Sequence, residues 1–176
     1  MALAAPLTNT PPCPIPRWPR RGGFTALETL LAAGILAIVA AAVSGALSAG
    51  RMQSRNAQDT VHASMLARAL MDEIIRLPYT DPHGYTSLGP DPGENNRTQY
   101  DNIKDYHGYT DGPSNVNDPA GNVYPSELQG YTRSVVMTPT SLSPPGWPMG
   151  PTGLLITVTV QKNGTTLATL QRMAVP

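Results

Sequence analysis

A long apolar run lies near the start of the chain, and a helical pattern follows it. Residues 29–50 carry no charged side chain, and as a helix they would extend about 33 Å, enough to cross a bilayer core of ~30 Å. The next stretch, 51–77, places apolar side chains on one stripe at helical spacing. The stripe consists of Ala63, Leu66, Ala67, Leu70, Met71, Ile74 and Leu77. Because Pro78 cannot continue a helix, we predict one helix over residues 24–77.

The end of the chain, residues 131–176, has patterns typical of antiparallel strands. Residues 131–138 are rich in β-forming side chains. Further on, Asn163 and Gly164 separate two runs of strand-like sequence, which is a strong signal for a hairpin with a two-residue turn. Three such strands could cover the apolar stripe of the helix, so the sequence predicts an α+β fold with a small antiparallel sheet.

The hairpin turn also predicts a register between its two strands. With this two-residue turn, Val160 would lie opposite Leu167. The same register would place two polar residues, Thr169 and Gln171, on the apolar face, so we expect that face to be only partly covered.

Between helix and strands, residues 78–130 are rich in Pro, Gly, Asn and Asp. All seven tyrosines lie within 79–131. They could form a recognition surface, because tyrosine combines an apolar ring with a hydrogen-bonding hydroxyl. We favour the alternative, in which the rings form a satellite core that orders a region poor in aliphatic residues.

Charge and composition exclude several function classes. From Phe24 onward the chain has nine Lys and Arg against twelve Asp and Glu, so we expect no nucleic-acid partner. No phosphate loop, nucleophile elbow or catalytic cysteine is present in this part, and we expect no enzymatic activity. Arg17, Arg20 and Arg21 precede the apolar run, which predicts a cytoplasmic N-terminus and a C-terminal body across the membrane.

One carboxylate, Glu28, stands at the start of the apolar run. A carboxylate in hydrocarbon costs roughly 2.5–3.5 kcal/mol and indicates a functional partner. Cleavage after Gly23 would create an amine on Phe24, four residues before Glu28 and opposite in charge. That amine, on the same chain or on a neighbour, is the partner we predict. The alternative is a carboxylate that snorkels to the interface.

Along the apolar helix, small side chains recur at every fourth position, and so do large ones, two positions away from the small ones. Two positions correspond to about 200° around a helix, so the two rows lie on opposite sides. Small rows allow helices to approach closely in lipid, so the pattern predicts packing against other helices; the alternative is an alanine-rich anchor without a partner. The small row consists of Ala33, Ala37, Ala41, Gly45 and Ala49.

The segment around Glu28 resembles the prepilin-peptidase site of type IV pilins and pseudopilins. The resemblance implies cleavage after Gly23, N-methylation of Phe24, and a role for Glu28 in recruiting neighbouring subunits. It departs from the common pattern at Ala26 and Thr29, and at Gly45, where major pilins often have proline. The matching residues are Arg20, Arg21, Gly22, Gly23, Phe24, Thr25, Leu27 and Glu28.

The resemblance also implies an organisation, a location and partners. The partners are the prepilin peptidase, other pilin or pseudopilin subunits and the inner-membrane assembly platform. The protein would span the inner membrane once, with a periplasmic body, and then enter an extracytoplasmic filament. Its sequence looks more like those of minor pilins and minor pseudopilins of the PilV and mannose-sensitive-haemagglutinin type than like that of a major subunit. The parts are a leader 1–23, a transmembrane and filament-core helix 24–50, an amphipathic helix 51–77, a loop region 78–130 and a strand region 131–176.

Two questions stay open at this level. Some pseudopilins bind calcium in their loops, and Asp101, Asp105 and Asp111 offer oxygen ligands for such a site. Their spacing does not fit an EF-hand, and we favour a solvated network of Asx turns without a cofactor. The competing hypothesis for the whole chain is an exported binding or enzymatic domain, held by an uncleaved signal anchor or released from a Sec or Tat signal peptide.

Overall fold

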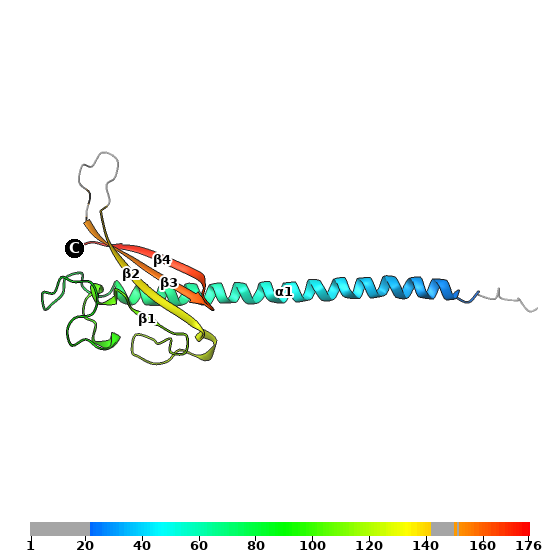
Figure 1. Cartoon of the computed structure of the whole chain (residues 1–176), viewed down its shortest axis with the longest axis horizontal. Helices are drawn as coiled ribbons and strands as arrows, with labels where there is room; N and C mark the ends of the chain where they lie inside the picture. The colour runs from blue at the N-terminus through cyan, green and yellow to red at the C-terminus, as the bar shows by residue number, and fades with distance from the viewer. Residues whose placement is uncertain (1–21, 142–149, 151) are drawn as a thin grey trace, which may run out of the picture. The chain divides into compact units, whose positions relative to one another are not determined.

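The computed structural model describes residues 22–141, 150 and 152–176. The chain divides into two units, one ending at Ser48 and one running from Ala49 to Pro176. Helix α1 belongs to both, and three short 3₁₀ helices and four strands complete the described secondary structure (Figure 1). The elements are α1 (Ala26–Ile74), 3₁₀ helices Arg97–Gln99, Ile103–Tyr106 and Ser126–Leu128, and strands β1 (Thr110–Asp111), β2 (Tyr131–Ser141), β3 (Thr152–Lys162) and β4 (Thr165–Ala174).

In the N-terminal unit, every described residue is exposed. Its large apolar side chains include Leu30, Leu36 and Ile38, each about seven-tenths exposed. α1 continues through Gly34 and Gly45 without a break. By length and composition, α1 is a helix that could cross a membrane, which is consistent with a single-pass membrane protein.

In the second unit, the apolar stripe of α1 is buried against the sheet, as the periodicity predicts. Six of the seven predicted positions are buried, from Ala63 to Ile74, and Leu77 is half-buried. The helix ends at Ile74, slightly earlier than predicted. Arg76 N donates to Glu73 O (3.2 Å) and Leu77 N to Ile74 O (3.1 Å), so the last turn tightens before Pro78, which disfavours helical backbone in the residue before it.

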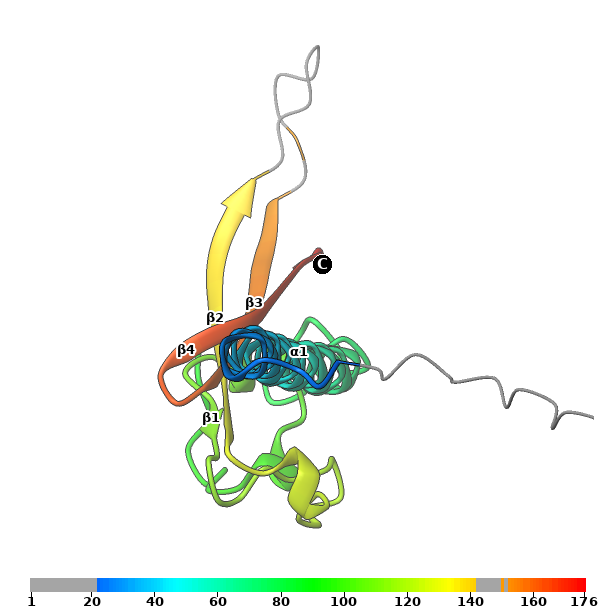
Figure 2. The ribbon, with the colours of Figure 1, turned by 90° about the vertical axis from the view of Figure 1, so that its right-hand side faces the viewer.

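The four strands form one antiparallel sheet in the order β1-β2-β3-β4. Figures 1 and 2 show the strands lying against the part of α1 that follows residue 49. The predicted hairpin turn joins β3 to β4, with Asn163 at φ 52° and Gly164 at φ 77°; positive φ at both positions is what a type I′ turn requires. The predicted α+β fold is therefore confirmed, and β1 adds a strand that the sequence did not reveal.

The predicted register of this hairpin is wrong by one residue. A β-bulge between Val160 and Gln161 sets Val160 opposite Ala168 and Val158 opposite Leu170. Because side chains alternate along a strand, the extra residue turns Thr169 and Gln171 away from the core face and Leu170 toward it. Leu170 packs against the core while Thr169 and Gln171 are exposed. The bulge thus takes Thr169 and Gln171 off the core face, and it places Arg172, which is exposed, opposite Ile156 at the edge of that face.

The core combines α1, the inner faces of β2 and β3, and side chains from the loop region. Tyr106 and Tyr131 are buried within it. The ring of Tyr106 lies 5.0 Å from that of Tyr100 and 5.7 Å from that of Tyr109, between ring centroids, a separation typical of favourable aromatic pairs. Besides the buried Tyr106 and Tyr131, four partly buried tyrosines pack against the core, and only the seventh, Tyr85, is exposed. The favoured interpretation of the tyrosines as a satellite core is confirmed.

Candidate functional site

The predicted processing bond lies just before α1. Gly22 and Gly23 are exposed and outside any helix or strand. α1 begins at Ala26, and Thr25 Oγ1 accepts a hydrogen bond from Glu28 N (3.3 Å). The Gly23–Phe24 bond therefore lies in exposed backbone outside any regular element.

The same geometry gives Glu28 a local role that was not predicted from the sequence. Thr25 and Glu28 have the spacing of a capping box, and Glu28 lies in the first turn of α1. A carboxylate at this end of a helix interacts favourably with the helix dipole by about 0.3–1 kcal/mol. The sequence signal for this cap is Thr-x-x-Glu before an apolar run. Because Glu28 can have both roles, a test of Glu28 must separate capping from pairing with a neighbour.

The small row is exposed along its whole length. Its five members, from Ala33 to Ala49, lie on α1 and none is buried. The row of small side chains is therefore accessible on the chain as described, and its packing against other helices stays a prediction.

The loop region contains a second candidate site, built where three stretches of chain converge. Ile103 N donates to Pro78 O (3.1 Å), and Gly89 N donates to Lys104 O (3.0 Å). These bonds hold the chain near residues 81, 91 and 105 together. The carboxylates of Asp81, Asp91 and Asp105 offer oxygens that lie within 4.8 Å of one another.

All three aspartates are buried, with exposed fractions of 4% for Asp81, 8% for Asp91 and 1% for Asp105. Asn102 Nδ2 donates to Asp81 Oδ2 (3.0 Å) and to Asp105 Oδ1 (2.8 Å). The Asp105 carboxylate also caps its 3₁₀ helix, because its Oδ2 accepts from Asp101 N (3.1 Å) and Asn102 N (3.0 Å). Asp91 Oδ2 is buried and accepts no hydrogen bond from the described residues.

Crowding of these carboxylates shifts their protonation equilibria. Hydrogen bonding with Asp81, followed by burial and the charges of the neighbouring acids, raises the pKa of Asp91 to about 6. The same contact lowers the pKa of Asp81. Burial raises the pKa of Asp105 and of Glu94. Two close carboxylates therefore share one proton over part of the pH range.

The structure divides the three aspartates that the sequence singled out as calcium ligands. Asp101 and Asp105 belong to overlapping groups of potential ligands with Asp81, Asp91, Glu94 and His83. Asp111 belongs to none of these groups in the described part of the chain; it pairs with Arg133 instead. Asp81 and Asp91 were not predicted from the sequence, because they lie in other stretches of the loop region and only the folded backbone brings them together.

A solvated Asx turn forms elsewhere in the region, at Asp118. Asp118 Oδ1 accepts from Ala120 N (2.9 Å) and Asn122 N (2.8 Å), and Asp118 is exposed. This turn is a local structure that satisfies its own backbone donors.

A buried ionic network joins α1, the loop region and the sheet. Arg97 Nε donates to Glu73 Oε1 (2.7 Å), and Tyr106 donates to the same oxygen (2.6 Å). Burial opposes the charge of Arg97, but the hydrogen bonds and charge interactions with Glu73 and Tyr109 together outweigh burial and raise the pKa of the guanidinium. Arg133 on β2 pairs with Asp111 on β1. Each charge has an opposite partner, so this network is structural.

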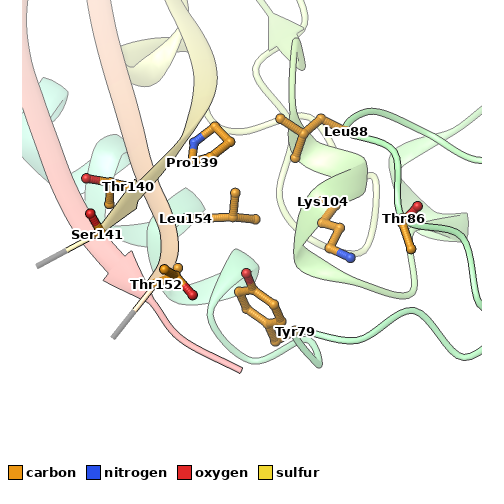
Figure 3. A pocket seen from close by; sticks show the side chains of 10 residues that line it. Tyr79, Thr86, Leu88, Lys104, Pro139, Thr140, Ser141, Thr152 and Leu154 are labelled. Atoms are coloured by element: carbon orange, nitrogen blue, oxygen red, sulfur yellow. The ribbon is translucent and has the colours of Figure 1, made fainter. Parts of the chain in front are cut away.

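An open cleft of about 530 Å³ lies beside the ends of β2 and β3. Figure 3 shows Pro139 and Leu154 on the sheet side and Leu88 and Lys104 on the loop side. Among the described residues that line it, Lys104 and Tyr79 are the titratable ones, and Lys104 Nζ lies 5.6 Å from the centre of the Tyr79 ring. The two groups do not form an acid–base or nucleophile–base pair that would indicate catalysis.

A scan against protein-family models, a search of curated proteins and a search of solved structures each found no match for this chain.

Proposed function

We propose that this protein is a structural subunit of a type IV pilus or of a type II secretion pseudopilus. In this proposal prepilin peptidase cuts after Gly23 and the new N-terminus is methylated. The observation that carries the proposal is the combination of an accessible Gly23–Phe24 bond with a carboxylate, Glu28, in the first turn of an exposed apolar helix. An α+β body that follows such a helix supports it.

Assembly would proceed through the N-terminal helix. Glu28 needs a partner once water is removed, because an unpaired charge in lipid or in a filament core is costly. The amine of Phe24 on a neighbouring subunit supplies an opposite charge, and the small row from Ala33 to Ala49 allows close helix packing. The prepilin peptidase, other subunits and the inner-membrane assembly platform are the proposed partners.

A minor subunit fits the body better than a major one. The loop region, 78–130, gives the protein a large surface with little regular structure, and a subunit at a tip or a priming position need not repeat such a region along a fibre. Before assembly the chain would sit in the inner membrane, with its N-terminus cytoplasmic and its body periplasmic.

The first test is the N-terminus of the native protein, measured by mass spectrometry after extraction from membranes. The proposal requires a chain that starts at N-methylated Phe24. A start at Met1, or near Ala49 as a signal-peptidase product would give, contradicts it and favours an anchored or secreted domain.

The second test separates the two roles of Glu28. Glu28→Gln removes the charge but keeps a residue that completes a capping box, whereas Glu28→Ala removes both. If pairing with a neighbour matters, both variants insert stably in the membrane but fail to enter sheared filaments, and Glu127→Gln, an exposed acid in the body, is incorporated normally. Normal incorporation of Glu28→Gln would show that capping is the only role of Glu28.

A further inference from the structure

We propose that Asp81, Asp91 and Asp105 form a calcium site that ties three stretches of the loop region together. The inference does not depend on filament assembly. It rests on three buried carboxylates with converging oxygens and on one buried oxygen, Asp91 Oδ2, that has no hydrogen-bond donor among the described residues.

The distances suit a calcium ion. Calcium lies 2.3–2.6 Å from its oxygen ligands, so two ligands on opposite sides of the ion are about 5 Å apart. The three carboxylate oxygens lie within 4.8 Å of one another. One ion can therefore contact all three carboxylates with little movement of the backbone.

The charges need a cation that the described side chains do not supply. A buried carboxylate is costly unless it is paired or coordinates a metal. No described Lys or Arg forms an ion pair with Asp81, Asp91 or Asp105. Lys104 is next to Asp105 in sequence, yet its amine lies over the Tyr79 ring. Asp111, a half-buried acid, differs in having two arginines nearby.

The chemistry of the ligands favours calcium over magnesium and zinc. The buried group offers oxygens only, and Glu94 and Asp101 form an overlapping group with Asp91 at its edge, so several carboxylates can contribute to the six to eight oxygens that calcium takes. Magnesium requires a near-ideal octahedron and keeps its waters. Zinc prefers nitrogen and sulfur, and the one imidazole nearby, His83, is largely exposed and pairs with Asp101 (3.1 Å).

The site has a structural consequence for the loop region. Asp81, Asp91 and Asp105 come from stretches that are joined by the backbone hydrogen bonds of Ile103 N to Pro78 O and of Gly89 N to Lys104 O, and by the side-chain bond of Asn102 Nδ2 to Asp81 Oδ2. An ion held by all three closes the loops between them and restrains the surface that they form.

The experiment uses the full chain in detergent micelles, stripped with EDTA and followed by the near-UV circular dichroism of its tyrosines during heating. At a free calcium concentration about 100 times Kd, we expect the unfolding midpoint to rise by about 10 °C. Because extracellular calcium modules bind at about 0.1–1 mM, the titration should extend to tens of millimolar. Magnesium at equal concentration should have a much smaller effect.

Two variants with the same chemical change test the residue. Asp91→Asn should lose most of the calcium-induced rise, whereas Asp72→Asn, an exposed acid on α1, should keep it. Without calcium at pH 7, Asp91→Asn should unfold at or above the wild-type midpoint, because it replaces an unpartnered buried charge; this control shows that the variant folds.

Several results overturn the proposal. No calcium effect on the wild type, or an equal effect on Asp91→Asn, excludes this site. An equal response to magnesium excludes the assignment to calcium. Stabilisation by zinc alone, lost in His83→Gln, would show that the imidazole group at the surface binds metal instead.

Discussion

Replacement of Arg133 by methionine tests the buried network most directly. The Arg133 side chain is fully buried. Its Nε donates to Asp111 Oδ1 (2.8 Å), and its Nη2 donates to Asn117 O (2.7 Å) and to Asp111 Oδ2. Arg133→Met keeps most of the apolar stem but removes the charge, which leaves Asp111 with weaker compensation.

The expected loss follows from what Asp111 retains. Removing one partner of a buried ion pair costs about 3–5 kcal/mol, because the other charge stays buried. Asp111 still accepts from Tyr109 OH (3.0 Å) and lies 3.7 Å from Arg97 Nη1. We therefore expect the lower end, about 3 kcal/mol, a large fraction of the 5–15 kcal/mol typical of a folded domain.

The assay is equilibrium unfolding in urea, again by tyrosine near-UV circular dichroism of the full chain in micelles. With a slope of about 2 kcal/mol per molar, a loss of about 3 kcal/mol lowers the midpoint by roughly 1.5 M. Arg172→Met on β4 is the matched control, because Arg172 is exposed, and it should change the free energy of unfolding by less than about 0.5 kcal/mol. Equal stability of the two variants would refute the assignment of the network to stability.

Three further predictions concern packing, backbone and pH. Leu70→Ala on the buried stripe should cost about 2–5 kcal/mol in the same urea assay. Gly112→Ala should cost at least about 2 kcal/mol, because a Cβ would lie 2.0 Å from Tyr131 O and φ is +94°; wild-type stability would contradict that geometry. Without calcium, Asp91 binds its proton more tightly in the folded state, with a pKa of about 6 against 3.8, so its contribution to stability is largest below pH 3.8 and is lost as pH rises through 6. Unfolding midpoints in EDTA from pH 4 to 7 should show this fall in the wild type and a smaller one in Asp91→Asn.

Local patterns in the sequence determined the regular elements. The helical period identified the buried stripe from Ala63 to Ile74, and Asn163-Gly164 identified the hairpin. These features are local, because a period or a two-residue turn depends on side chains a few positions apart. The apolar run, Glu28 and the capping spacing from Thr25 to Glu28 are local in the same sense.

Longer-range features were decided only by the tertiary structure. The bulge after Val160 shifted the pairing of β3 with β4 by one residue. This shift lets Leu170 pack on the core, which a pairing set by the turn alone would not do. Asp111 met Arg133 instead of Asp101, because strand pairing brings together residues that are distant in sequence. The convergence of Asp81, Asp91 and Asp105 has the same origin: each stretch is irregular, so no period signals it, and backbone hydrogen bonds between loops set the distances.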